Sequence, residues 1–590
     1  MSTVATTTAP LPLKGWSQEL ARAWNSNSYT VFVLQGNIFD VFPLQTDGPV
    51  TYVSLKAFLA QRMFPQLSYL LFYDIADGLS FGTPAMQKAF FEWLELYDQV
   101  EGSALHVSGP PREFNKLVPL LHRFFMAAAE QKTYRGLALI IDFPEKIVPA
   151  AEEAGLSVDE RIALVSLLKW ASSPEFRRLD IGVLLVTESA AELHADLLQN
   201  PHVAQIALPL PDADERQQFL AAGGAARGAD DSQLAAASDL ALDALAARTA
   251  GLNLLRIQHL IADAVHNDSR ITSEYVAQSK KRLIEEYCQG LVKFKEPKPG
   301  LNLDVVATHT AAKKKFRELA QLIKANRGDV LERGVLLPGR VGVGKSFLID
   351  CFASECGLPV MEMGDFRSKW VGDTERQLSK ILLTIKALGP VIVIVDEADA
   401  VFGNRASDGD SGVSTRVFAA FAAHIGDASL RGRELWIAMT SRPDLLAIDM
   451  KRQGRFGLCI PLFPAQNEDE VRDLFTVIAR SKGVTFTDDM RAFVREKLGA
   501  APLTGSEVEA MLLRAKEQAA LDNRTEVRLA DLQEAVASFV DPLDPTLIAM
   551  QDLAAVLACS DNRFLPARYR DVERATLTGT FALLKAKLIG

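Results

Sequence analysis

The sequence contains little cysteine, with five residues in 590. They are scattered, and the closest two, Cys351 and Cys356, have no second pair at the spacing of a zinc site. We therefore expect buried, inert thiols rather than metal ligands, and a reducing compartment. The other cysteines are Cys288, Cys459 and Cys559.

Targeting signals, membrane-length apolar runs and excess positive charge are also missing. The first residues, MSTVATTTAPLPLKG, lack a cationic start followed by an apolar core, so no secretory signal is predicted. No apolar run approaches the roughly 18 residues of a membrane helix. The net charge of −10 argues against non-specific nucleic-acid binding, which needs a basic face. We expect a cytoplasmic protein with neither membrane nor nucleic-acid partners.

Two rounds of the same pattern fill most of the chain, which is 48% hydrophobic and 23% charged. In each round, apolar runs alternate with helical patterns, and a purely helical stretch follows. This alternation predicts an α/β fold of two modules, each a parallel five-stranded sheet with flanking helices and a helical lid. The expected strands lie at 30–35, 67–74, 137–142, 181–187 and 203–211, then at 333–339, 358–364, 390–399, 434–441 and 456–464.

The composition also predicts domain boundaries. A segment rich in Gly, Pro and Lys, QGLVKFKEPKPG, separates the rounds and indicates a linker. The predicted parts are a flexible tail (1–14), an α/β domain (15–211) with its helical lid (212–288), the linker (289–300), a second α/β domain (301–465) with its lid (466–540), and a C-terminal extension (541–590) whose role the sequence leaves open.

The second half contains a phosphate-binding loop. Residues 339–346, GRVGVGKS, match the pattern G-x-x-x-x-G-K-[ST], and they lie between an expected strand and an expected helix. The glycines let backbone N–H groups surround phosphate oxygens, the lysine reaches the β- and γ-phosphates, and the serine holds Mg²⁺. The predicted ATP-binding residues are Gly339, Arg340, Val341, Gly342, Val343, Gly344, Lys345, Ser346 and, opening the helix, Phe347.

A second signal follows about fifty residues later, in VIVIVDEAD. Its β-branched residues predict a buried strand. At its end, Asp396 is expected near the metal, and Glu397 is expected to polarise the attacking water. A second acid at this place indicates hydrolysis rather than nucleotide binding alone.

Residues 440–456, TSRPDLLAIDMKRQGRF, resemble the second region of homology of classical AAA ATPases, the group that contains katanin, FtsH-type proteases and valosin-containing protein. The resemblance implies that Arg452 and Arg455 are arginine fingers acting on the ATP site of the next subunit. Ser441 falls where the family carries its sensor-1 asparagine. The segment LTGSEVEAMLLRA (503–515) resembles the family's lid helix, which implies that Gly505 and Ser506 lie beside the adenine.

The same resemblance implies a loop that grips substrate. Many AAA unfoldases carry an aromatic–aliphatic–glycine trio facing a central pore, and Trp370, Val371 and Gly372, preceded by Lys369, match it. An aromatic ring offers large apolar area that holds an extended polypeptide without reading its sequence. GNRASDGDSG (403–412) matches the position of a second pore-side loop, and a plain solvated loop is an equal alternative.

The first half lacks this chemistry. Gly36 follows its first expected strand, but no second glycine, lysine or Ser/Thr comes at the required spacing. Asp142 aligns with Asp396, and Phe143 replaces Glu397. We predict a degenerate AAA-like module that neither binds ATP tightly nor hydrolyses it. A parallel α/β domain of unrelated origin is the alternative. The layout resembles bacterial and plastid-encoded AAA proteins in which an inactive module precedes an active one.

These observations predict an Mg-ATP-dependent AAA ATPase that assembles into a homo-oligomeric ring, by resemblance a hexamer, and remodels a protein substrate delivered directly or by an adaptor. The alternative from another class is a slow nucleotide-dependent scaffold or assembly switch that threads no polypeptide. The sequence identifies neither substrate nor pathway.

Overall fold

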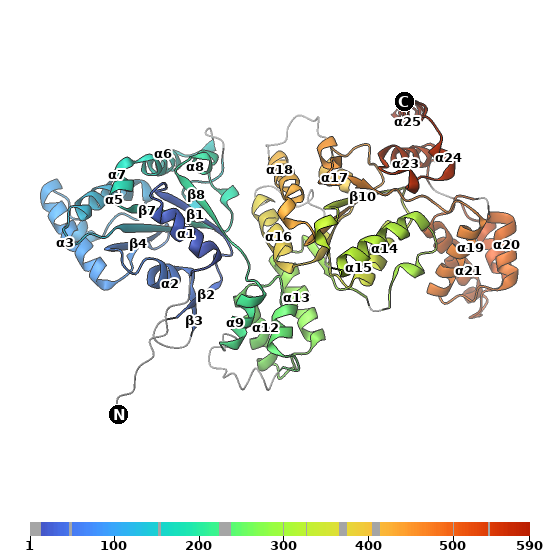
Figure 1. Cartoon of the computed structure of the whole chain (residues 1–590), viewed down its shortest axis with the longest axis horizontal. Coiled ribbons are helices and arrows are strands. Elements are labelled where there is room, and N and C mark those ends of the chain that lie inside the picture. Colours follow the sequence, from blue (N-terminus) through green and yellow to red (C-terminus); the bar gives the residue numbers. More distant parts are fainter. Residues whose placement is uncertain are drawn as a thin grey trace. The chain divides into compact units, whose positions relative to one another are not determined.

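The protein is described by a computed structural model (Figure 1). It describes residues 13–45, 50–151, 155–222, 238–298, 300–325, 327–364, 374–403, 413–499, 501–540 and 543–589. The chain divides into two compact units. The first comprises residues 1–284 with 373–387, and the second comprises residues 285–372 with 388–590.

The first unit is built on a six-stranded sheet in the order β5-β4-β6-β7-β1-β8. Neighbouring strands are parallel, except that β5 runs antiparallel to β4. The strands are β1 (Val31–Gly36), β4 (Tyr69–Asp74), β5 (Gly78–Phe81), β6 (Leu137–Asp142), β7 (Ile181–Thr187) and β8 (Val203–Leu208). A small hairpin, β2 (Val41–Leu44) with β3 (Thr51–Ser54), follows β1.

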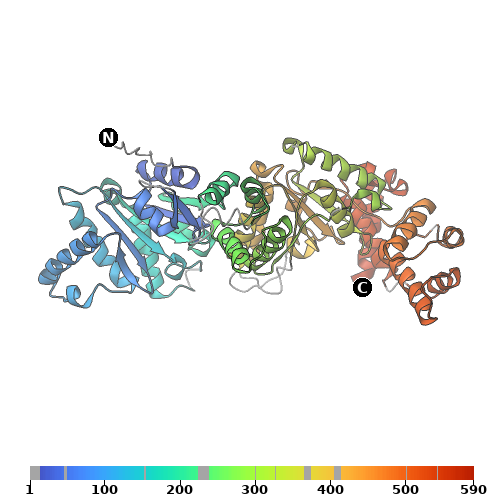
Figure 2. The same cartoon turned by 90° about the horizontal axis from the view of Figure 1, so that it is seen from below.

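Helices cover both faces of this sheet, because successive strand residues point to opposite sides. Val31 and Val33 of β1 enter one apolar core, and Phe32 and Leu34 enter the other. Figure 2 shows the same sheet from below. One core includes residues of α3 (Pro84–Glu101), α5 (Phe114–Ala129), α6 (Val158–Ser172), α7 (Pro174–Arg178) and α8 (Ala195–Gln199); the other includes residues of α1 (Gly15–Asn25) and α2 (Leu55–Phe58). The short α4 spans Leu105–Ser108.

A helical lid follows β8. Asp212 and Glu215 form a reciprocal capping box at the start of its first helix. Arg216 is buried in that helix, and its guanidinium donates to the backbone oxygens of Ala246 (2.7 Å) and Pro211 (2.6 Å). One side chain therefore joins the first two lid helices to the segment leaving the sheet. The lid helices are α9 (Ala213–Ala221), α11 (Leu242–Arg248), α12 (Leu254–His266) and α13 (Ser273–Tyr287).

The second unit repeats this architecture with the order β14-β10-β13-β12-β11-β9. Again one edge strand, here β9, is antiparallel. The strands are β9 (Val292–Lys295), β10 (Gly334–Pro338), β11 (Val360–Met363), β12 (Val391–Val395), β13 (Glu434–Thr440) and β14 (Leu458–Cys459). The helices of this α/β domain are α14 (Thr310–Lys324), α15 (Lys345–Cys356), α17 (Ala398–Phe402) and α18 (Val413–Gly426). The helix that follows β11 along the chain, α16 (Thr374–Leu388), belongs to the first unit except for its last residue.

A second lid and the C-terminal extension complete this unit. The lid has its own core, formed by α19 (Glu468–Ser481), α20 (Asp488–Leu498), α21 (Gly505–Leu521) and α22 (Leu529–Ala537). The extension, which sequence reasoning left unplaced, packs along the edge of the sheet. The backbone N–H of Cys459 in β14 donates to the Ser560 hydroxyl (2.8 Å), and Phe564 enters the core of the α/β domain. The extension folds as α23 (Pro545–Ala558), α24 (Ala567–Arg570) and α25 (Arg574–Ile589).

The prediction of five parallel strands per module is wrong by one strand in each sheet. Both additional strands are short antiparallel edges, and β9 lies inside the segment predicted as a linker. Val292 and Phe294 are buried in β9, while Lys293 and Lys295 carry the charges that are common on edge strands. In sequence these four residues, VKFK, look like part of a linker. They form a strand because β11 supplies their hydrogen-bond partners.

Four of the five cysteines are buried, as predicted for the closest pair, and Cys559 is half-buried. All five cysteines are free thiols, and Cys351 and Cys356 are buried in the second unit. Burial raises the pKa of both thiols to about 12, so they stay protonated at neutral pH. No helix among the described residues is both long and apolar enough to cross a membrane.

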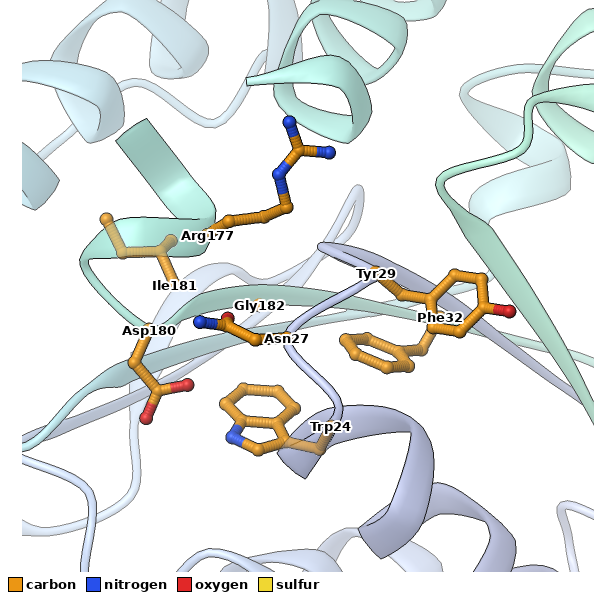
Figure 3. A pocket seen from close by; sticks show the side chains of 8 residues that line it. All are labelled: Trp24, Asn27, Tyr29, Phe32, Arg177, Asp180, Ile181 and Gly182. Atoms are coloured by element: carbon orange, nitrogen blue, oxygen red, sulfur yellow. The ribbon is translucent and has the colours of Figure 1, made fainter. Parts of the chain in front are cut away.

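A small recess lies where β1 and β7 begin in the first unit (Figure 3). It holds about 10 Å³, which admits no more than one water molecule. The Trp24 indole lies against Gly182 in this recess and stacks on Phe32, with the ring centroids 5.4 Å apart. A Cβ atom on Gly182 would come within 2.2 Å of the indole. The aromatic ring therefore requires glycine at this position.

We predict that Gly182→Ala lowers the free energy of unfolding by about 1–3 kcal/mol, because the rigid indole has to move out of its packed position. Chemical denaturation followed by circular dichroism measures this. Gly155→Ala is the control in the same unit, because the nearest atom to its added Cβ is 3.8 Å away. Equal stability of the two variants would contradict the packing argument.

Candidate functional site

A cavity of about 610 Å³ opens in the second unit, where β10, β12 and β13 end. Parallel strands bring the loops after their carboxyl ends to one edge of the sheet, which is where α/β proteins bind ligands. The cavity is lined by the phosphate loop, the acidic strand end, the end of β13, the segment before α14, and the lid. Its lining includes Val341, Gly342, Val343, Gly344, Lys345, Ser346, Phe347, Asp396, Glu397, Thr440, Ser441, Gly505 and Ser506.

The phosphate loop joins β10 to α15. Gly342 and Gly344 have positive φ values of 84° and 90°, which L side chains rarely adopt. Gly344 is also the N-cap of α15. Gly339 needs its glycine for space, because a Cβ there would lie 2.6 Å from the backbone oxygen of Leu462. The loop therefore turns tightly into the amino end of a helix, which is an anion-binding geometry.

Lys345 lies in the cavity at the first turn of α15. Its ammonium donates to the backbone oxygens of Gly339 (2.8 Å) and Arg340 (3.2 Å). Desolvation lowers the pKa of this lysine, while Asp396 and Asp399 oppose that shift. The cation is therefore held over the loop by weak neutral acceptors that a phosphate group can replace.

The two predicted acids stand together at the end of β12. The backbone N–H of Glu397 donates to the Asp396 carboxylate (2.9 Å). Glu397 has φ 46° and ψ 45° and caps α17, so the chain turns sharply between the two residues. A non-glycine residue in the left-handed region is uncommon and marks a constrained turn. Both carboxylates face the cavity that holds Lys345 and Ser346.

The end of β13 is tied to the acidic turn. The Thr440 hydroxyl donates to Asp399 (2.5 Å) and accepts from the backbone N–H of Arg442 (2.9 Å). Ser441, the predicted sensor residue between Thr440 and Arg442, lines the cavity. The Arg442 guanidinium pairs with the Asp444 carboxylate through two contacts of 2.9 Å. This pair fixes the chain that leaves the sensor position.

The lid reaches the cavity with the amino end of α21. Ser506 donates its backbone N–H to the carbonyl of Gly342 (3.3 Å), which brings Gly505 and Ser506 onto the cavity wall. Arg340 makes a second connection, donating to Pro502 O (2.5 Å) and lying 3.6 Å from the Glu507 carboxylate. Arg340 was assigned to nucleotide binding, but its side chain is 6% exposed and turned to the lid. It therefore connects phosphate loop and lid.

Sequence reasoning missed most of the apolar wall. The segment before α14 and the lid helix α19 carry no motif. Periodicity marks their apolar residues as core, so only the folded cavity distinguishes them. The lining residues outside the predicted set, apolar and polar together, include Val305, Val306, Ala307, Thr308, His309, Leu474, Val477, Ile478, Ser481, Lys482 and Glu509.

Arg452 and Arg455 lie outside this cavity. The Arg452 side chain is 69% exposed and 3.3 Å from the Asp449 carboxylate, and Arg455 donates to the Asp449 carbonyl (3.0 Å). The predicted pore residues Lys369, Trp370, Val371 and Gly372 fall outside the described residues, as does nearly all of 403–412.

The fold and this cavity define a phosphate-loop nucleoside-triphosphatase domain. Residues 335–464 match the family model of the ATPases associated with various cellular activities (AAA). Residues 7–209 match the N-terminal Rossmann-like domain of AAA+ chaperones, and residues 214–289 match their second helical domain. The chain therefore combines an N-terminal domain and a helical domain of the AAA+ chaperone type with an AAA ATPase domain. The alternative of an unrelated first α/β domain is set aside.

The curated relatives share only part of this chain. It is similar to the proteasome-activating nucleotidase of Methanothermobacter thermautotrophicus, with 30% identity over 35% of this chain and 50% of that protein. It is also similar to the ATP-dependent zinc metalloprotease FtsH of Helicobacter pylori (30%, over 40% of this chain and 39% of that protein). The AAA domain-containing protein ycf46 of Trieres chinensis is 29% identical over 35% of this chain and 42% of its own length. The matches thus span half or less of these relatives.

The first unit repeats the turn of the second residue by residue. Asp142 ends β6, and Phe143 has φ 54° and ψ 46°, nearly the angles of Glu397. The Thr187 hydroxyl at the end of β7 donates to Glu145 (3.2 Å), as Thr440 donates to Asp399. The predicted alignment of Asp142 with Asp396 agrees with this geometry.

His309 carries a pH-dependent contact. Its Nε2–H donates to the Val343 carbonyl in the phosphate loop (2.8 Å). Burial lowers the pKa of this imidazole to about 4, and the nearby Lys313 adds to the shift. Because the pKa in the unfolded chain is near 6.5, the unfolded state binds the proton more readily between pH 6.5 and 4. The stability from neutral His309 is therefore full above pH 6.5 and is lost as pH falls toward 4.

We predict that His309→Gln, which can still donate to Val343, makes stability less sensitive to acid. The urea midpoint of the wild type should fall more between pH 7 and 5 than that of the variant. Urea denaturation followed by circular dichroism at both pH values measures the difference. An identical fall in both proteins would contradict the assignment.

Proposed function

We propose that the second unit binds Mg-ATP and hydrolyses it. The observation that supports this most directly is the convergence of Lys345, Ser346, Asp396 and Glu397 on one cavity beside a glycine loop and a helix N-terminus. Ammonium, hydroxyl and carboxylate groups around backbone N–H donors are the set that suits a magnesium-bound triphosphate. The apolar wall of Val305, Ala307 and Ile478 suits a flat base.

Each residue has a definite role in this proposal. Lys345 holds the phosphates, and Ser346 and Asp396 hold Mg²⁺, which would neutralise charge on the phosphates. Glu397 orients and polarises the attacking water, and Ser441 positions it. Closure of α19 and α21 over the base excludes bulk water, which strengthens the electrostatic interactions inside.

We further propose that the active form is a homo-oligomeric ring, by resemblance a hexamer. The exposed Arg452 and the half-buried Arg455 lie outside the cavity of their own chain, so they are available to a neighbouring subunit. An arginine finger supplied from outside is typically worth about 10³–10⁵ in rate.

The proposed work is remodelling of a protein substrate, presented directly or through an adaptor. Two relatives are named a proteasome-activating nucleotidase and an ATP-dependent metalloprotease, and the first half matches domains named for AAA+ chaperones. Within this proposal the first unit is catalytically silent and serves as a platform, because Phe143 replaces the water-activating acid. Five free thiols support work in the reducing cytoplasm.

Lys345→Ala is predicted to abolish ATP binding, because it removes the cation that holds the phosphates. Glu397→Gln should still bind ATP while hydrolysis falls by at least about a hundredfold, because the amide cannot accept the proton of water. Equilibrium binding of a fluorescent ATP analogue and phosphate release separate the two effects. Normal phosphate release by Glu397→Gln would refute the catalytic assignment.

Trp370→Ala is predicted to spare basal ATPase activity and to stop substrate remodelling, because it removes the apolar ring that grips polypeptide. The substrate for this assay comes from capture by Glu397→Gln in ATP, followed by mass spectrometry. Basal phosphate release is the internal control. Undiminished processing by Trp370→Ala would favour the nucleotide-dependent scaffold instead.

A further inference from the structure

The loop after β1 in the first unit begins like a phosphate loop. Gln35 in β1 pairs with Thr187 in β7, and Pro338 in β10 pairs with Thr440 in β13. Gln35 is followed by Gly36, and Pro338 is followed by Gly339. A Cβ added to Gly36 would lie 2.6 Å from the backbone oxygen of Leu208. A Cβ added to Gly339 would lie at the same distance from the backbone oxygen of Leu462. Gly36 therefore occupies the place of the first phosphate-loop glycine.

Beyond Gly36 the chain puts a carboxylate against the lid. Asp40 is 4% exposed. Its two carboxylate oxygens accept the backbone N–H groups of Leu254 (3.1 Å) and Leu255 (3.0 Å), at the amino end of the lid helix α12. Asn37, also buried, donates to the same carboxylate (2.7 Å) and accepts from Asn253, the N-cap of α12 (3.4 Å).

The second unit holds the corresponding helix differently. There the second helical residue of α21, Ser506, donates to the carbonyl of Gly342, and the phosphate loop stays open to the cavity. In the first unit Leu255, also the second residue of its helix, donates to an ionisable side chain. Burial raises the pKa of Asp40, while the hydrogen bonds from Asn37, Leu254 and Leu255 oppose that shift. The dipole of α12 and the charge-assisted character of these hydrogen bonds also favour the carboxylate.

The outer side of the same loop is apolar. Phe39 is 53% exposed and lies beside Phe143, which is 46% exposed, with their ring centroids 6.2 Å apart. Two aromatic rings thus stand where the second unit carries glycine amides and Glu397. They offer no donors to phosphate oxygens.

We propose that Asp40 is an internal anion that takes the place of nucleotide in the first unit and locks its lid to the sheet permanently. The lid of the second unit responds to ATP, and the lid of the first does not. This gives the silent unit a definite role, since a platform that stays closed keeps one shape through the ATP cycle. The lid of the second unit is the comparison for the lid of the first, and its response to ATP rests on the proposed function.

Hydrogen–deuterium exchange of the full-length chain tests the lock, read at residues 250–262 with and without Mg-ATP. In Asp40→Ala, exchange at Leu254 and Leu255 should accelerate at least about tenfold, because two charge-assisted hydrogen bonds are lost. Asp74→Ala is the matched control. Asp74 lies at the same sheet edge and accepts two backbone N–H groups (2.8 and 2.9 Å) from its own turn. That variant should leave α12 unchanged.

Mg-ATP should leave exchange in α12 of the wild type unchanged and slow exchange at the start of α21. Slowing in α12 by Mg-ATP, or unaltered α12 exchange in Asp40→Ala, would overturn the lock. If Asp40→Ala does not fold, Asp40→Asn is tested instead, because its amide oxygen can still accept a hydrogen bond but carries no charge. Exchange at Leu254 and Leu255 should then rise about threefold. No rise in this variant would overturn the proposal. Failure of Mg-ATP to slow α21, with the α12 results as expected, would overturn the proposed function and leave the lock standing.

Discussion

In a parallel sheet every strand ends at the same edge, and the backbone groups freed there need partners. Each of the two sheets meets this constraint at the loop after β1 or β10, the strand next to one edge of its sheet. In the second unit the loop turns through glycines and presents N–H groups to a cavity. In the first it turns inward and satisfies the lid helix with a carboxylate. The difference between an ATP site and a sealed module lies in how one loop of about eight residues satisfies hydrogen bonds.

The lid is the second element in this comparison. In both units the N-terminus of a lid helix, α12 or α21, faces the loop that follows β1 or β10. The first N–H groups of such a helix have no partner within the helix and carry a partial positive charge. Arg340 and Gly342 hold α21 beside an open cavity, while Asp40 and Asn37 hold α12 with none of their polar groups left toward solvent. A site that must exchange a ligand needs weak acceptors, whereas a fixed platform is better served by a buried charge with several partners.

The turn after the acidic strand has the same geometry in both units, although the residues that form it differ. Phe143 is a bulky residue in the left-handed region, a conformation with a steric cost that side chains of its size seldom pay. The neighbouring Thr187–Glu145 hydrogen bond matches Thr440–Asp399. The same strand-to-helix turn therefore accommodates a phenylalanine in one unit and a glutamate in the other.

The sequence alone determined the strands, the phosphate loop and the pairing of Asp142 with Asp396, because buried strands are short apolar runs and the loop needs glycines at fixed spacing. It could not find the antiparallel edges β5 and β9, whose residues become strand only through a neighbour's hydrogen bonds. Nor could it find the apolar wall of α19, since a core residue and a base-contacting residue look alike in sequence. Asp40 follows Phe39 and precedes Val41 in the sequence, and it matches no motif. Only the tertiary structure, by bringing α12 within 3.0 Å of it across 215 residues, made it a partner of the lid.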